Sequence, residues 1–216
     1  MESLNIIEIG AKVGLYFVPF LFALCFHEFA HAFVAKLRGD RTAEMMGRLS
    51  MNPLVHMDMV GTLLLPLGAI FMGLPFFGWA KPVPVNPKNF KDIKNDMFWV
   101  ALAGPLSNVL LAIVAVVAIS LFRGALSGFS FAIAAESILR VFLIINLFLA
   151  FFNMLPFHPL DGGKVFARFL PYEWNKKLED NQHVLSMVLI GLFIFGGLRY
   201  LAIPVYAIND LLLSFV

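Results

Sequence analysis

Two histidines and a glutamate lie within five residues of one another in the stretch His27-Glu28-Phe29-Ala30-His31. On an α-helix with about 3.6 residues per turn, His27 and His31 project from one face, one turn apart, so both imidazoles can bind one metal ion. Glu28 projects about 100° around the helix, where it can hydrogen-bond a water on that metal without filling a coordination position. This spacing predicts a zinc-dependent hydrolase.

The residues around this motif, from about Leu15 to Leu37, are otherwise apolar. An ionisable side chain at the centre of a membrane helix costs about 2.5–3.5 kcal/mol on insertion scales, so three in one turn need compensation. A metal ion and a water-filled cavity would provide it. The alternative is a pair of core histidines with ordinary hydrogen-bond partners, and burial in lipid disfavours that interpretation.

The composition is that of a membrane protein. The chain has 216 residues, of which 60% are hydrophobic and 14% charged, and its mean hydropathy is +0.85. These values lie outside the soluble globular range and predict a polytopic bundle of α-helices in the lipid bilayer. Net charge is +2 with Lys and Arg scattered along the chain, so we expect no nucleic-acid partner. A single cysteine, Cys25, excludes an intrachain disulfide and a Cys-rich zinc site.

Positive charges predict which segments face the cytoplasm. Four Lys or Arg lie in each of the segments 36–58, 80–96 and 157–183, whereas 1–12 and 123–133 hold one each. By the positive-inside rule the first three segments are cytoplasmic. Two strong apolar runs, 97–122 and about 134–155, are each long enough to cross a hydrocarbon core of about 30 Å, and a last apolar block follows at 184–216.

The run 59–79 has cytoplasmic flanks on both sides and contains several glycines and prolines. We therefore expect it to enter and leave the membrane on one side, as a re-entrant element that lines a water cavity. The alternative is an ordinary span. Prolines in the segment 78–87 favour extended backbone. The predicted fold is an all-α bundle with a re-entrant, extended (β-hairpin-like) element near the active site.

A catalytic zinc takes three protein ligands and a water, so a third donor is needed. The candidate stretch is Asn153 to Gly163, where two prolines break a span. Asp161 offers an oxygen ligand there, and the neighbouring glycines let the backbone approach closely. His158, in the same stretch, is an alternative ligand or a hydrogen-bond partner of a ligand.

With HEFAH at 27–31, NMLPFHPLDGG at 153–163 and GPLSN at 104–108, the chain resembles the site-2 protease family of intramembrane zinc metalloproteases over about residues 15–170. The segment 78–87 also looks like the re-entrant edge of that family. The resemblance implies one zinc ion per chain.

Residue by residue, the resemblance implies that His27, His31 and Asp161 hold the zinc, that Glu28 is general base and then general acid, and that Asn153 contacts the substrate or its oxyanion. Asn108 is expected either to contact the substrate or to bridge helices within the bundle.

The expected partners are transmembrane segments of other membrane proteins, which must unwind before their peptide bonds can be cleaved. The amides of Val83 and Val85 could pair with such an unwound segment, because the segment 81–86 is expected to be an edge with unpaired amides and carbonyls. The alternative function is a metal transporter or a catalytically silent binder of membrane segments. Apart from residues 27, 28 and 31 the first span is apolar, which disfavours a transport path.

We expect one membrane-embedded metalloprotease domain over residues 1–216, with a core of about 13–170 and a carboxy-terminal apolar block at 184–216. No PDZ or CBS domain is recognised in the sequence. The expected location is the cell membrane, the inner one in a bacterium, with the active site toward the cytoplasm.

Overall fold

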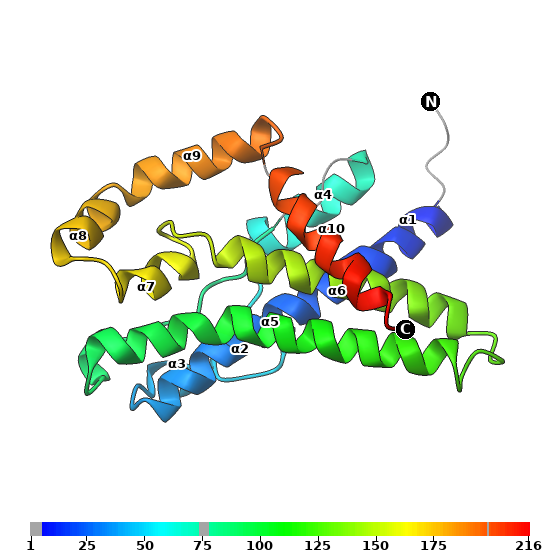
Figure 1. Ribbon diagram of the computed structural model, residues 1–216, viewed down its shortest axis with the longest axis horizontal. Helices are drawn as coiled ribbons and strands as arrows, with labels where there is room; N and C mark the ends of the chain where they lie inside the picture. Colours follow the sequence, from blue (N-terminus) through cyan, green and yellow to red (C-terminus); the bar gives the residue numbers. More distant parts are fainter. Residues whose placement is uncertain (1–5, 74–77, 198) are drawn as a thin grey trace.

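The computed structural model describes residues 6–73, 78–197 and 199–216, and these ranges contain helices and loops but no β-strand (Figure 1). Within these ranges, three helices are long and apolar enough to cross a membrane. The first is continuous from Ile6 to Leu37 and consists of α1 (Ile6–Lys12), a π-helical turn (Val13–Phe17) and α2 (Val18–Leu37). The others are α5 (Ile93–Arg123) and α6 (Ala132–Asn153). The predicted helical, multi-pass membrane protein is therefore confirmed.

Shorter helices connect and flank these spans. They are α3 (Thr42–Met45), a 3-10 turn (Pro53–Val55), the π-helical segment η3 (Met59–Leu64), α4 (Leu65–Met72), a second 3-10 turn (Pro87–Asn89), α7 (Asp161–Ala167), α8 (Tyr172–Asp180), α9 (Gln182–Ile194) and α10 (Arg199–Leu213). The apolar block at 184–216 thus forms parts of two helices rather than one.

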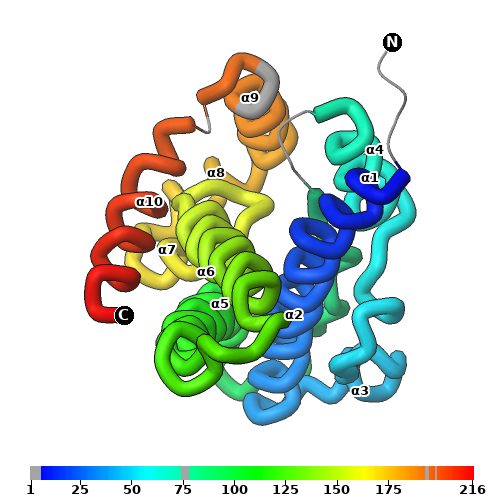
Figure 2. The backbone as a smooth tube through the Cα atoms, turned by 90° about the vertical axis from the view of Figure 1, so that its right-hand side faces the viewer, coloured from blue at the N-terminus to red at the C-terminus, as the bar shows by residue number. Residues whose placement is uncertain are grey.

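The long helix α5 packs along both α2 and α6, and Figure 2 shows these three helices grouped in the middle of the molecule. Small residues on α5, Ala112 and Ala115, are buried against Leu143 and Leu147 of α6, which lets the helices approach closely. Close contact is needed here because dispersion and interhelical hydrogen bonds hold membrane helices together. The imidazole and carboxylate groups of α2 and the carboxylate that begins α7 can then be held at fixed distances.

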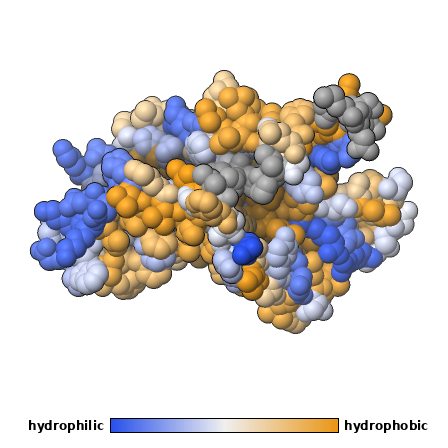
Figure 3. Space-filling model, turned by 90° about the horizontal axis from the view of Figure 1, so that it is seen from above, coloured by the Kyte–Doolittle hydropathy of each residue, from blue (hydrophilic) through white to orange (hydrophobic). Residues whose placement is uncertain are grey.

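Large apolar side chains also cover the outside of the bundle. Leu110 is 62% exposed, Val117 57% and Ile133 81%. Hydrophobic residues occupy much of the face drawn in Figure 3, and hydrophilic ones form separate patches toward both ends of the molecule. Such a surface is expected where side chains face lipid tails.

The interrupted run that follows residue 58 turns back on itself. After η3 and α4 the chain turns at Gly73, whose φ of +64° is left-handed, and residues 74–77 lie outside the described ranges. The two ends then meet, because the Trp79 amide donates to the Gly61 carbonyl at 3.1 Å and the Thr62 hydroxyl donates to the Trp79 carbonyl at 2.7 Å. A Cβ at Gly61 would collide with the Trp79 ring, so this close return requires glycine. The described part of this loop forms no β-ladder.

Candidate metal centre and cleft

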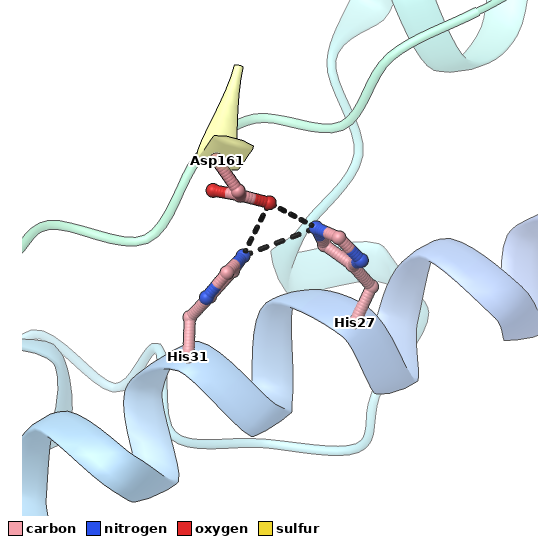
Figure 4. A group of neighbouring side chains, drawn as sticks. All are labelled: His27, His31 and Asp161. Atoms are coloured by element: carbon pink, nitrogen blue, oxygen red, sulfur yellow. Dashed lines mark hydrogen bonds and ion pairs between the residues drawn. The ribbon is translucent and has the colours of Figure 1, made fainter. Parts of the chain in front are cut away.

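Two helices bring the predicted ligands together. His27 and His31 project from one face of α2, and Asp161 begins α7 (Figure 4). Nε2 of His27 lies 3.0 Å from Nε2 of His31 and 3.1 Å from Oδ2 of Asp161, and Nε2 of His31 lies 3.2 Å from the same oxygen. The ligand atoms all lie within 4.8 Å of one another. Tetrahedral zinc with bonds of about 2.0–2.2 Å to nitrogen and oxygen requires similar spacings.

The hydrogen bonds of the two Nδ1 atoms, which face away from the ligand cluster, indicate the protonation of both imidazoles. Nδ1 of His27 lies 2.6 Å from Oδ1 of Asn108, and Nδ1 of His31 lies 2.7 Å from the carbonyl oxygen of Val100. Both partners can only accept, so each Nδ1 carries its proton and each Nε2 of the neutral ring has a lone pair. Two lone pairs and a carboxylate oxygen then face one another. A divalent cation fits this donor set, because it can form a coordination bond with each of the three donor atoms, which would otherwise repel one another.

Gly104 of α5 makes room for this arrangement. A Cβ at this position would collide with Nε2 of His31 and lie 2.6 Å from Cε1 of His27. The glycine therefore allows the α5 backbone to lie directly against the two imidazoles, in the GPLSN motif that also contains Asn108. Any side chain here would have to push the ligands aside.

Glu28 is buried beside this centre, with 8% of its surface exposed. Its Oε2 accepts a hydrogen bond of 2.8 Å from the Val83 amide, while Oε1 has no partner in the described part of the chain. Both residues line a cleft of about 720 Å³ whose walls are mostly apolar. This cleft is also lined by His27, His31, Asp161, Val85, Asn153, Lys164 and, from α9, Ser186, Leu189 and Ile190.

Most backbone groups of the predicted substrate edge are already paired, which corrects the expectation of a free edge at 81–86. The Lys81 amide donates to the His56 carbonyl at 2.8 Å, and Nη2 of Arg48 donates to the Lys81 carbonyl at 2.7 Å. At the other end the Asn86 amide donates to Oδ2 of Asp40 at 2.7 Å. The loop that follows α2 therefore anchors both ends of the segment beside the cleft.

Asp40 is suited to this anchoring because it remains charged. Burial raises the pKa of its carboxyl group, but hydrogen bonds from Thr42, Asn86 and Asn89 outweigh burial and hold the pKa below its ordinary value. Arg48 is also buried, with 9% exposed. The sequence identified neither residue, since their partners lie 46 and 33 positions away.

Between the two anchors, one amide has no partner among the described residues, that of Val85. In extended backbone, residues two apart point their amides to the same side. The Val83 amide points at Glu28, so we expect the Val85 amide to face the cleft as well.

Asn153 and Asn108 are placed differently from each other. Asn153 lines the cleft, although one of its amide hydrogens is donated to the Leu149 carbonyl at 3.0 Å. Asn108 is completely buried behind His27 and does not line the cleft. It bridges helices, the alternative that the sequence left open, and we do not propose it as a substrate contact.

His158 lies outside the ligand group. Its side chain is 7% exposed, its Nε2 has no partner in the described ranges, and it is absent from the cleft wall. Asp161 lies beside the two imidazoles of α2, and His158 does not, so Asp161 is the third candidate ligand.

Comparison with known proteins gives a consistent result. The model of peptidase family M50 matches residues 15–134 and 124–196. Over 179 residues the chain is 32% identical to the putative zinc metalloprotease YwhC of Bacillus subtilis, covering 82% of this chain and 78% of that protein. Over 187 residues it is 31% identical to Rip2 of Mycolicibacterium smegmatis, which has the same description, covering 86% and 68%. No solved structure matches the chain.

Proposed function

The chain belongs to peptidase family M50, the site-2 protease family, and on this premise we propose that it cleaves transmembrane segments of other membrane proteins by zinc-dependent hydrolysis. The observation that carries the proposal is the convergence of His27, His31 and Asp161 at one side of a largely apolar cleft that Glu28 also lines. An apolar cleft in a membrane protein suits a substrate that arrives through lipid. We assign the zinc to these three ligands, one ion per chain.

Zinc bound there would polarise the scissile carbonyl and lower the pKa of a water molecule. Glu28 would accept a proton from the attacking water on Oε1, the oxygen that Val83 leaves free, and then donate it to the leaving amine. The Val83 amide orients the carboxylate for both steps. The apolar walls limit the access of other water, which strengthens the electrostatic interactions inside the cleft.

We further propose that the loop 59–86 is re-entrant and that substrate pairs in extended form with the Val85 amide. The cytoplasmic side of the membrane is assigned to 36–58, 80–96 and 157–183 by their positive charges. The carboxyl ends of α2 and α6 and the amino end of α5 would then face the cytoplasm together. One domain, with its core at about 13–170, would carry the whole site.

The metal assignment predicts a specific loss. Wild-type protein purified in detergent should carry about one zinc per chain, and Asp161→Ala should lose most of it because a two-ligand site binds zinc weakly. Metal analysis by mass spectrometry measures the content, and cleavage of co-reconstituted single-span proteins in liposomes should fall in parallel. His158→Ala is the matched control and should keep its zinc. Full zinc in Asp161→Ala, with loss in His158→Ala, would move the third ligand to His158.

The edge assignment predicts that two neighbouring proline substitutions act differently. Val85→Pro removes an amide that only the substrate would use, so we expect the KM for a membrane substrate to rise about tenfold, the value of one main-chain hydrogen bond. Val83→Pro removes the amide that orients Glu28, so we expect kcat to fall instead. Zinc content should be unchanged in both.

Val83→Ala and Val85→Ala keep the amides and serve as controls for these kinetics. A Val85→Pro protein with the wild-type KM would show that substrate is not held at this edge. The zinc assignment would be unaffected by that result.

A further inference from the structure

A chain of buried amides connects α6 to the metal-facing side of α2. Nδ2 of Asn108 on α5 lies 2.9 Å from Oδ1 of Asn146 on α6, and Nδ2 of Asn146 donates to the Phe142 carbonyl at 2.8 Å. Oδ1 of Asn108 lies 2.6 Å from Nδ1 of His27. Asn108 and Asn146 are both fully buried, with 0% exposed. Neither residue lines the cleft.

The direction of each hydrogen bond in this series of amides is determined at the α6 end of the series, by the Phe142 carbonyl. The Phe142 carbonyl can only accept, so the donor side of the Asn146 amide must face it, and Oδ1 must face Asn108. Asn108 then has to present Nδ2 to Asn146, and its Oδ1 to His27. The Ala23 carbonyl, 3.4 Å from the same Nδ2, favours this orientation too.

The opposite orientation would place acceptors against acceptors. If the Asn108 amide were reversed, its oxygen would face both Oδ1 of Asn146 and the Ala23 carbonyl. A buried polar group without a partner costs about 1–3 kcal/mol, and both asparagine side chains are fully buried, away from bulk solvent. The backbone of α6 thus determines that an acceptor meets Nδ1 of His27.

We propose that Asn146 is a positioning residue for the metal centre: through Asn108 it fixes the tautomer of His27 with the proton on Nδ1 and the lone pair on Nε2. This inference rests on the proposed function only for the presence of a metal. Nε2 of His27 is the atom that lies 3.1 Å from Asp161 and 3.0 Å from His31. Without these amide hydrogen bonds, the tautomer of His27 with its proton on Nε2 would compete, and zinc would bind more weakly because that proton must first leave Nε2.

Zinc affinity tests the proposal without any substrate. Full-length protein in detergent is titrated with zinc against a fluorescent chelator at neutral pH. Asn146→Leu has a similar size but no hydrogen bonds, and we expect its zinc Kd to rise about tenfold, as for other partners of metal ligands. Asn146→Asp still accepts from Asn108, ionised or not, and should bind zinc nearly as tightly as wild type.

Asn146→Asp also distinguishes a positioning role from a general effect on folding. A carboxyl group buried among apolar helices should lower the thermal stability more than leucine does, whereas the zinc affinity of this variant should stay near that of wild type. Asn209→Leu is the matched control, since Asn209 is another buried amide, 6% exposed on α10, that is unconnected to His27. The proposal expects loss of zinc affinity in Asn146→Leu alone.

Two results would overturn the proposal. One is wild-type zinc affinity in Asn146→Leu. The other is a zinc affinity that follows thermal stability across the three variants, so that the affinity of Asn146→Asp falls at least as far as that of Asn146→Leu. A wild-type protein that binds zinc but cleaves nothing would contradict the proposed function and leave this series interpretable.

Discussion

Replacing Glu28 with glutamine should reduce cleavage by about 10³-fold while zinc remains bound, because a general base commonly contributes 10²–10⁴-fold and the three ligands are untouched. Glutamine keeps the size of the side chain, and its amide oxygen can still accept from the Val83 amide. What it loses is the capacity to take a proton on Oε1. Initial cleavage rates in liposomes and the zinc content of the same preparation measure the two properties separately.

Glu44→Gln is a matched control for this experiment. Glu44 lies on α3 at the surface, paired with Lys36 and Arg41 at 2.6 Å each. It does not line the cleft, so its replacement should leave cleavage and zinc unchanged. If Glu28→Gln cleaves at the wild-type rate, Glu28 is not the base. If it loses its zinc instead, the carboxylate acts on the metal site.

Replacing Gly104 with alanine should weaken zinc binding by about 100-fold. The added Cβ would collide with His31 and His27 in the space that the metal ligands occupy. Relief requires the helix or the ligands to move, and overpacking of this kind costs about 1–3 kcal/mol, where each 1.4 kcal/mol is tenfold in affinity. Cleavage should be lost with the metal.

Zinc titration of Gly104→Ala against a chelator measures this effect. Gly14→Ala places the same methyl group in the first membrane helix, where nothing lies within 4 Å, and should be neutral. A Gly104→Ala protein with wild-type zinc affinity would mean that the ligands sit farther from α5 than we describe.

The metal ligands could be predicted from sequence because their geometry is local. A separation of four residues on a helix places two imidazoles on one face whatever surrounds them, and the break before Asp161 marks where a second segment can approach. The contacts behind the ligands depend instead on how helices pack. Asn146 lies 38 residues from Asn108 and 119 from His27. Nothing in the amino-acid pattern of α6 distinguishes it from an asparagine in a membrane helix that has no part in the site.

The edge at 81–86 shows the same limit. Its prolines correctly predicted a segment without helix, and they identified which amides remained. They did not reveal that the Val83 amide would donate a hydrogen bond to Glu28, or that Arg48 and Asp40 would form hydrogen bonds with the two ends of the segment. All three partners lie far away in the sequence. Counting unpaired backbone groups therefore required the tertiary structure.

If this zinc centre hydrolyses peptide bonds in membrane segments, it produces new protein termini in the membrane, and sequencing those termini detects them. Membranes from cells that express wild-type protein are compared by mass spectrometry with membranes from cells that express Glu28→Gln at equal level and equal zinc content. We predict new termini within or next to apolar segments of membrane proteins in the wild-type sample only. Identical sets of termini in the two samples would contradict the claim and favour a metal transporter or a silent binder of membrane segments.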